Sequence, residues 1–366
     1  MKALRFIKKN TVFCIAAFVA VVTCFLVPPD KQYLDYFDWK TLSCLFLTLA
    51  VVCALRNIKF FTILARKLVT IAGNLRSLFL LLIVITFIGS MIIANDMALI
   101  TFLPLGYFAL SVTKQEKYMA YLFVLQNVSA NLGGMLTPFG NPQNLYLYSY
   151  FNIPTGEFCK IMLPSFLLAV LLLVVACIPI KSVKFSIDEE FAEKLDVKKT
   201  TLYIVLFLAA ILIVFRIIPF VIGLIVIPII LFFADRESLK MVDYALLGTF
   251  FFFFIFAGNL ARMDAVNTLI SSLLSKDTLI VSALSCQFIS NVPSAILLSR
   301  FTGDYAALLL GVNIGGTGTL IASLASLITF SEFRLLHPEQ TKKYLCIFTV
   351  VNVVFLVVLT TAAKLL

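Results

Sequence analysis

The sequence predicts an all-α polytopic membrane protein, and three observations support this fold class. Of the 366 residues, 61% are hydrophobic, whereas a soluble domain is closer to half apolar. The apolar residues fall in blocks of roughly 17 to 25, each long enough to cross about 30 Å of hydrocarbon as a helix. These blocks lack the alternation over about 10 residues that is typical of membrane barrel strands. Because the bilayer core offers no water to free backbone groups, each block must form a helix.

The blocks predict about nine spans and two re-entrant hairpins, with the N-terminus in the cytoplasm and the C-terminus outside. Four basic residues occupy the first nine positions, and basic residues beside a span favour the cytoplasmic side. No small-x-small cleavage site precedes Pro28-Pro29, so we expect a retained span rather than a signal peptide. In chain order the spans are 11–28, 41–55, 118–151, 161–180, 200–217, 219–234, 243–261, 305–330 and 344–363, and the hairpins are 77–113 and 277–302.

Charge divides the chain into segments. The stretch 181–199 is the one clearly charged linker, and we expect it in the cytoplasm. We expect the whole chain in the plasma membrane, which in a bacterium is the inner membrane. The expected segments are 1–40 (first span and loop), 41–180 (first repeat), 181–199 (linker), 200–242 (two spans) and 243–366 (second repeat).

Several function classes are disfavoured by the sequence. The net charge of +10 comes from Lys and Arg in short loops, which set orientation, so we expect no nucleic-acid partner. The eight cysteines form no Cys-x-x-Cys pair or Cys/His cluster, which disfavours a zinc site and a disulfide framework. No hydrolase or metalloprotease motif occurs in the spans, so we expect no enzyme. The expected partners are the bilayer and a small solute.

An internal repeat dominates the chemistry of the sequence. The heptapeptide Asn131-Leu-Gly-Gly-Met-Leu-Thr137 recurs as Asn313-Ile-Gly-Gly-Thr-Gly-Thr319. A polar tip precedes each copy within an apolar background, first Ala94-Asn95-Asp96-Met97 and then Ser290-Asn291-Val292-Pro293. The predicted spans run in opposite directions in the two copies. Inverted repeats of this kind build many secondary transporters, with the binding site at the midplane where broken helices meet.

The polar tips and glycine breaks predict a binding site, because polar groups at membrane depth are costly and irregular backbone there must line a cavity or be buried in protein. Half-helix N-termini would favour an anion, and freed carbonyl groups would favour a cation. Asp96 is the only acid at these positions, and its expected role is to coordinate Na⁺ or to exchange H⁺. The candidate residues for substrate and ion are Asn95, Asp96, Asn131, Gly133, Gly134, Thr137, Gly140, Asn141, Asn144, Ser290, Asn291, Asn313, Gly315, Gly316, Thr317 and Thr319.

We expect Na⁺, if it is the coupling ion, at Asn95, Asp96 and Asn291. Two alternatives stay open for these motifs. The tips can be plain helix caps in kinked spans, and the glycines can serve close helix packing, as small residues often do in membranes. The prolines and amides of Thr137-Pro-Phe-Gly-Asn-Pro-Gln-Asn144 argue against simple packing in the first copy.

The two tips and two breaks resemble the ion transporter superfamily, which includes divalent anion:sodium symporters, citrate–metal transporters, arsenite permeases and one class of sodium/proton antiporters. Residues 95–104 and 136–144 are most similar to the bacterial permeases grouped with citrate transporters, and the resemblance covers about 40–366. It implies a scaffold domain that forms a homodimer and a transport domain that moves as an elevator. It also implies that Asn95, Ser290 and Asn291 contact Na⁺ and carboxylate, as in the dicarboxylate branch.

This sequence departs from the dicarboxylate pattern, because Ala94 replaces a serine, and Asp96 and Val292 replace two threonines. The lost hydroxyl groups disfavour a dicarboxylate and give Asp96 more weight in ion coupling. The leading prediction is a secondary transporter of a small anion, first of all a carboxylate, coupled to Na⁺ or H⁺. The alternatives are efflux of arsenite or antimonite and sodium/proton antiport. A channel is disfavoured, because closed polar tips do not form a continuous pore.

Overall fold

The computed structural model describes residues 10–69, 71–184 and 195–365. Within these ranges the chain is helical, and its only β-type pairing is an isolated bridge between Asn74 and Lys184. The expected fold class is therefore confirmed. Most of the charged linker 181–199 and the basic residues of the first nine positions lie outside the described residues. The helices of the first half are α2 (Thr11–Leu26), α3 (Trp39–Asn57), α4 (Phe60–Val69), α5 (Leu75–Ile93), α6 (Asn95–Val112), α7 (Met119–Gly133), α8 (Pro142–Tyr150) and α9 (Thr155–Cys177).

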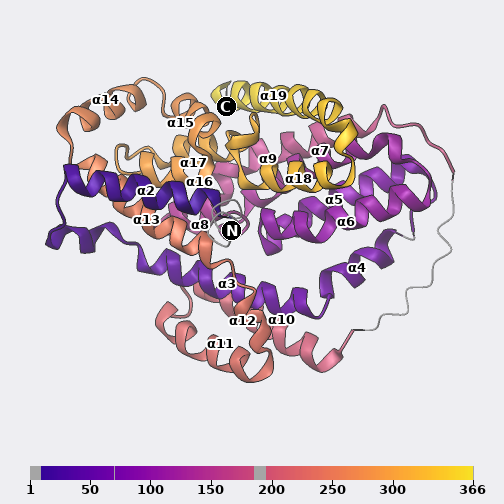
Figure 1. Ribbon diagram of the computed structural model, residues 1–366, viewed down its shortest axis with the longest axis horizontal. Coiled ribbons are helices and arrows are strands. Elements are labelled where there is room, and N and C mark those ends of the chain that lie inside the picture. The colour runs from indigo at the N-terminus through magenta and orange to yellow at the C-terminus, as the bar shows by residue number, and fades with distance from the viewer. Residues whose placement is uncertain (1–9, 70, 185–194, 366) are drawn as a thin grey trace.

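The second half is also helical, and most long helices lie along the longest axis of the molecule (Figure 1). Short 3-10 turns connect several helices, including η1 (Lys31–Tyr36) before α3 and η3 (Gly134–Leu136) after α7. The helices of this half are α10 (Val197–Val214), α11 (Phe220–Ala234), α12 (Arg236–Lys240), α13 (Tyr244–Ala261), α14 (Asp264–Leu274), α15 (Thr278–Ile289), α16 (Asn291–Leu298), α17 (Tyr305–Ile314), α18 (Leu324–Leu336) and α19 (Thr341–Leu365).

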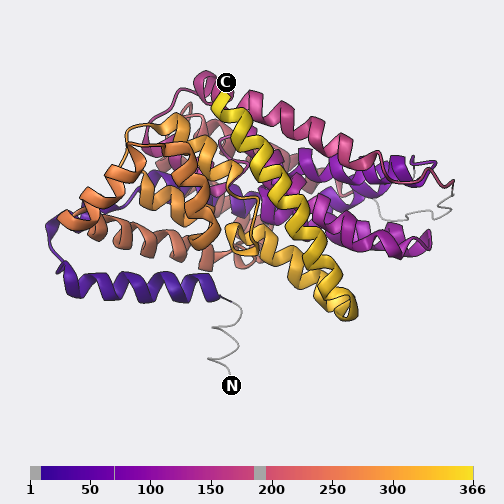
Figure 2. The same ribbon diagram turned by 90° about the horizontal axis from the view of Figure 1, so that it is seen from above.

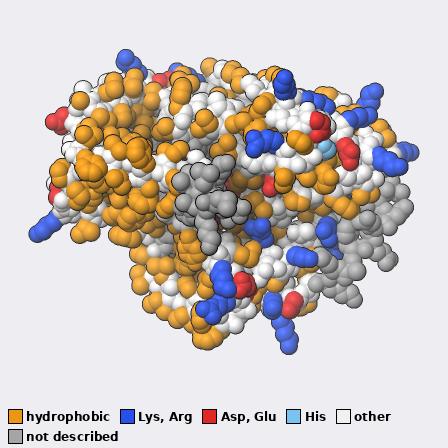
Figure 3. Space-filling model, viewed as in Figure 1, with side chains coloured by type: hydrophobic (Ala, Val, Ile, Leu, Met, Phe, Trp, Pro, Cys, Tyr) orange, Lys and Arg blue, Asp and Glu red, His pale blue; other side chains and the backbone are white. Residues whose placement is uncertain are grey.

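Seven helices of the described chain are long and apolar enough to cross a membrane, or eight if the bent pair α14–α15 is one span. Their outer faces carry exposed apolar side chains, for example Leu167 on α9 and Val357 on α19, as expected for helices solvated by lipid. Broad hydrophobic areas cover the left and lower parts of the face in Figure 3. The helix α19 crosses diagonally over the bundle in Figure 2, so it presents one long side to the surroundings.

Span lengths differ from the expected pattern in detail. The helices α2 and α11 are present but have 16 and 15 residues, which is at the short end for a span. In the expected first hairpin, α5 and α6 have 19 and 18 residues, so each is long enough to cross alone. The expected second hairpin consists of the shorter α15 and α16, with 12 and 8 residues. The number of spans and the re-entrant course stay predictions.

Both polar tips form the same backbone turn. Ala94, between α5 and α6, has φ 69° and ψ 154°, and Ser290, between α15 and α16, has φ 74° and ψ 160°. In each turn the following asparagine, Asn95 or Asn291, accepts a hydrogen bond from the next backbone N–H at 2.9 Å. Positive φ costs a residue with a side chain about 1–3 kcal/mol and tends to occur at functional sites. Equal geometry at matched positions supports the repeat.

The first glycine of each heptapeptide allows two helices to approach closely. A Cβ on Gly133 would lie 2.3 Å from the backbone oxygen of Phe87 in α5, and a Cβ on Gly315 would lie 2.8 Å from the Cα of Ala283 in α15. Because real Cβ atoms do not come so close, only glycine permits α7 to pack on α5 and α17 on α15 in this way. Gly133 and Gly315 therefore serve close helix packing, which was one of the two alternatives for these motifs.

The halves exchange helices across the centre of the molecule. After the first break, α8 packs against α16 and α17 of the second half. After the second break, α18 packs against α6 and α7 of the first half. The helices α3 and α13 contact α8 and α16 from the outside. Each broken helix therefore ends beside the tip of the opposite half, which places the two breaks next to each other.

Candidate functional site

Side-chain amides from both breaks meet at Asn313, which is 1% exposed. Its Nδ2 donates to Asn144 Oδ1 at 2.5 Å and to the backbone oxygen of Leu309 at 2.8 Å. Its Oδ1 accepts from Asn141 Nδ2 at 3.2 Å and from Gln143 Nε2 at 3.4 Å. The asparagine of the second heptapeptide is thus bound directly to the first break, about 170 positions away in the sequence.

The first tip belongs to the same network. Asn95 Nδ2 donates to Asn131 Oδ1 at 3.3 Å, and Asn141 Nδ2 donates to the backbone oxygen of Asn131 at 3.2 Å. Asn95 and Asn131 are 4% and 2% exposed. Buried amides are costly unless they are hydrogen-bonded, and here each one finds its partner on a different element. Tip, first break and second break are therefore joined through side chains.

Asn144 fixes the irregular backbone of the first break. Its Nδ2 lies within hydrogen-bond distance of the backbone oxygens of Gly134, Met135 and Thr137, at 3.1, 3.2 and 3.3 Å. Thr137 in turn donates from Oγ1 to the backbone oxygen of Met91 in α5 at 2.8 Å. A Cβ on Gly140 would lie 2.4 Å from the oxygen of Gly134. These residues hold the break in shape.

The second break is fixed differently, by a residue that sequence reasoning missed. Gln287 of α15 donates from Nε2 to the backbone oxygens of Gly315 and Thr317 at 2.8 and 3.0 Å, and its Oε1 accepts from the Thr319 N–H at 2.8 Å. Thr317 Oγ1 donates locally, to Ile314. The signal for Gln287 was its position three residues before the second tip, inside an apolar helix.

The second tip stands beside this break. Ser290 Oγ lies 3.3 Å from the backbone oxygen of Ala322 and 3.4 Å from Asn291 Oδ1. A Cβ on Gly316 would lie 3.1 Å from Asn291 Nδ2, so Asn291 rests against the heptapeptide glycine. Among the described residues, no hydrogen bond joins Asn291 to the amides around Asn313.

Two further polar residues extend the amide network from α7 to α18. Asn127 donates to Ser326 Oγ at 3.3 Å and lies near Asn131, whose Nδ2 is 3.5 Å from Asn127 Oδ1. Ser323 caps α18 by accepting from the Ser326 N–H at 3.1 Å. Asn127 is one helical turn before Asn131, which is the sequence signal that could have identified it.

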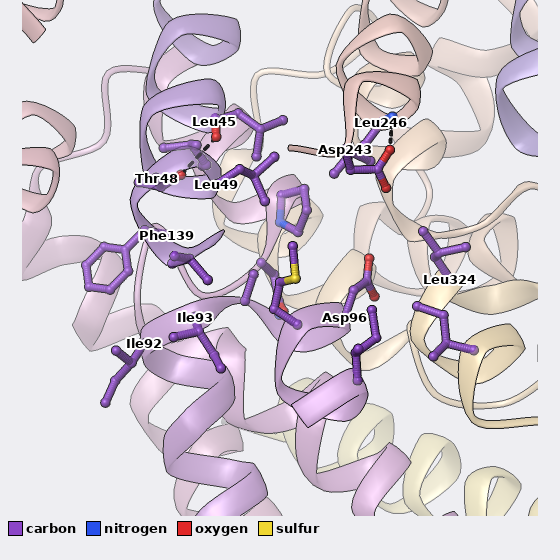
Figure 4. Close-up of a pocket in the computed structure, with 18 residues that line it drawn as sticks. Leu45, Thr48, Leu49, Ile92, Ile93, Asp96, Phe139, Asp243, Leu246 and Leu324 are labelled. Atoms are coloured by element: carbon purple, nitrogen blue, oxygen red, sulfur yellow. Dashed lines mark hydrogen bonds between the residues drawn. The ribbon is translucent and has the colours of Figure 1, made fainter. Parts of the chain in front are cut away.

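A cavity adjoins the network, with a volume of about 70 Å³, or about 680 Å³ of empty space when its open mouth is included. The first tip, the first break, α3 and the N-terminal ends of α13 and α18 enclose it (Figure 4). Most of its lining is apolar, which is usual for small-molecule sites. Of the expected site residues, Asp96 and Asn141 line it; the polar lining is completed by two residues that sequence reasoning missed, Thr48 and Asp243.

Helix N-termini dominate the electrostatics of this cavity. The helices α6, α8, α13 and α18 all begin at or within a few residues of its lining. Helix N-termini carry free N–H groups and a partial positive charge, which favour anions. Among the described residues, no Lys or Arg lines the cavity. The neighbouring Arg56 donates to Met97 Sδ at 3.8 Å. The polar side chains of the lining therefore present negative or neutral oxygen atoms to the cavity, and the partial positive charge comes from the backbone N–H groups at the helix N-termini.

Comparisons with known proteins agree with a transport function. A family model described as citrate transporter matches residues 4–306. An uncharacterized transporter of Methanocaldococcus jannaschii is 34% identical over 334 residues, covering 89% of this chain and 90% of that protein. The inner membrane protein YbiR of Escherichia coli is 29% identical over 338 residues, covering 89% and 88%. The silicon efflux transporter LSI3 of rice, Oryza sativa subsp. japonica, is 32% identical over 154 residues, covering 42% and 29%.

Proposed function

Since the chain belongs to the citrate transporter family, and is therefore a membrane transporter of that type, we propose that it carries a small anion by cation-coupled secondary transport. A carboxylate is the first candidate, and Na⁺ or H⁺ the coupling ion. The observation that carries the proposal is the meeting of four helix N-termini at one cavity beside the buried amide network. Broken helices with their N-termini at a shared site are how many secondary transporters hold anionic groups without a basic side chain.

Alternating access requires a path that is closed on one side while it is open on the other. At the N-terminal end of α13, Asp243 lines the cavity. At the other end of α13, Arg262 is paired with Asp30 at 2.6 Å and donates to the Tyr36 hydroxyl at 3.0 Å. Arg300, just after α16, donates to the backbone oxygen of Tyr36 at 2.5 Å. Polar contacts join the elements at this end of α13.

We also propose, from the resemblance to the wider superfamily, that the chain has a fixed part and a moving part. We propose that α3, α4 and α10–α14 form a scaffold that pairs with a second copy of the chain. The tips and broken helices would then move against this scaffold as an elevator. The expected orientation places the N-terminus in the cytoplasm, so that the cavity opens toward the cytoplasm in this conformation.

A second candidate solute is a neutral, hydroxylated oxyacid that the protein exports. The side chains that line the cavity with free oxygen atoms, Asp96 and Asn141, accept hydrogen bonds, and a solute rich in O–H donors would match them better than a fully ionised carboxylate does. The similarity to a silicon efflux transporter is in line with such a solute, although it spans less than half of this chain.

The test is uptake by the purified protein in proteoliposomes, with citrate, smaller carboxylates and silicic acid as solutes. Asn95→Ala and Asn291→Ala should each lose uptake while remaining folded, because both asparagines shape a tip. Asn352→Ala is the matched control, since Asn352 is fully buried in α19 and donates only to Phe348 within its own helix. Normal uptake by both tip variants would contradict the proposal, as would equal loss in the control.

A further inference from the structure

Two carboxylate side chains reach the cavity from elements that sequence reasoning never placed together. Asp96 comes from the first turn of α6, and Asp243 is the N-cap of α13. Figure 4 shows both facing the same space from opposite sides. Asp243 Oδ1 accepts the Leu246 N–H at 2.9 Å. Asp96 Oδ1 is buried and accepts no hydrogen bond from the described residues.

A second oxygen atom at this cavity, on Asn141, is likewise without a hydrogen bond in the described chain. Asn141 is 1% exposed and lines the cavity. Its Nδ2 donates to Asn131 and Asn313, which fixes the amide, yet its Oδ1 accepts no hydrogen bond within the described chain. A buried acceptor without a donor calls for an explanation, and a bound ion is one such explanation. Asp96 and Asn141 thus offer oxygen atoms without a hydrogen bond to the cavity that Asp243 also lines.

The charges around this space point to the same kind of ligand. No Lys or Arg of the part of the chain that the structure describes lines the cavity, and Arg56 is directed at the sulfur of Met97. An anion placed beside Asp96 and Asp243 would meet like charge, which low-dielectric surroundings strengthen. A cation between the two carboxylates removes that conflict. Carboxylate and amide oxygens are the ligands of hard cations.

We propose that Asp96, Asn141 and Asp243 bind one Na⁺ ion, and that Asp243 completes this site from α13. The proposal rests on the proposed function, because it names the coupling ion and its place. It differs from the site expected at Asn95, Asp96 and Asn291, because neither Asn95 nor Asn291 lines this cavity. Na⁺ joins the first tip to α13, and its release leaves two facing carboxylates that push the tip away.

The test uses Na⁺ alone as the probe. Thermal unfolding of the purified protein is followed over a NaCl series, with choline chloride keeping the ionic strength constant, because a ligand of the folded state raises the melting temperature. The variants are Asp243→Asn and Asp96→Asn. Asp38→Asn is the matched control: Asp38 caps α3 by accepting the Thr41 N–H, as Asp243 caps α13. Asparagine is also a good cap, so these changes remove charge and keep the cap.

Na⁺ should stabilise the wild type and Asp38→Asn with the same half-saturating concentration. That concentration should rise at least about tenfold in Asp243→Asn and Asp96→Asn, since a charged ligand is lost. In choline alone, Asp243→Asn should melt higher than the wild type, because one of two facing charges is gone. A purely structural role of Asp243 would not produce this rise. If Asp243→Asn does not fold, Asp243→Ser takes its place, because serine also caps helices.

An Asp243 variant that responds to Na⁺ like the wild type would overturn the proposal, and so would a wild type without any Na⁺ response. Solute uptake is measured separately in the same preparations. If the wild type takes up solute but shows no Na⁺ response, the transport function stands and the Na⁺ site falls. If it neither takes up solute nor responds to Na⁺, both proposals fall.

Discussion

Replacing Asn313 by alanine should lower the free energy of unfolding, because this side chain joins the two halves of the molecule. It makes three hydrogen bonds to the first break, through Asn144, Asn141 and Gln143. Side-chain hydrogen bonds between membrane helices average about 0.6 kcal/mol, so losing three costs about 2 kcal/mol. The substitution also leaves Asn144 Oδ1 and Gln143 Nε2 buried without that partner, which adds to the loss.

The assay is reversible unfolding in mixed micelles, titrated with dodecyl sulfate and followed by circular dichroism. Asn352→Ala removes the same group of atoms from an equally buried site, but breaks only the bond to Phe348 within α19. It should therefore cost about 0.6 kcal/mol. If Asn313→Ala were no more destabilising than this control, the amide network would not hold the two halves together.

Three more measurements test other parts of the structure. Gly133→Ala should destabilise by about 1–3 kcal/mol in the same assay, because the new Cβ meets the backbone of α5 at 2.3 Å, whereas Gly156→Ala, with nothing within 4 Å, should not. Arg262 lowers the pKa of Asp30 by a side-chain hydrogen bond, so that pair stabilises above about pH 4 and the benefit is lost as the pH falls through the lowered pKa. Arg262→Gln should remove this loss of stability, so that its melting temperature falls less than that of the wild type as the pH is lowered. An unchanged dependence of the melting temperature on pH would contradict this prediction. Lysines in 181–199 should react with impermeant reagents from the cytoplasm, and labelling from outside would invert the topology.

Helix ends could be predicted from the sequence. Asn95 and Asn291 are the first residues of α6 and α16, where the polar tips predicted that helices meet. Gly133 ends α7, where the first heptapeptide predicted a break. These features are local, because a polar or glycine-rich stretch in an apolar run interrupts a helix wherever the rest of the chain lies.

Partners across the molecule could not be predicted in the same way. Asn127 bonds Ser326 at a separation of 199 positions, and Gln287 reaches carbonyl groups about 30 positions away. Neither residue belongs to the repeated motifs. The sequence placed a boundary at 277 but did not predict the angle of 118° between α14 and α15. Such choices depend on packing between distant segments.

Asp243 occupies the same place in the second repeat as Asp38 does in the first. Asp38 precedes α3 and Asp243 precedes α13, and both cap their helix by the same bond. The two helices are the matching first spans of the expected repeats. Asp243 faces the cavity, while the Tyr36 backbone oxygen, before α3, accepts a hydrogen bond from Arg300. If the two halves exchange roles during transport, Arg300 must release Tyr36. The end of the interface at Asp243 and the end at Tyr36 would then open in turn, with one closed while the other is open. Alternating access requires this, because a path that is open at both ends is a channel.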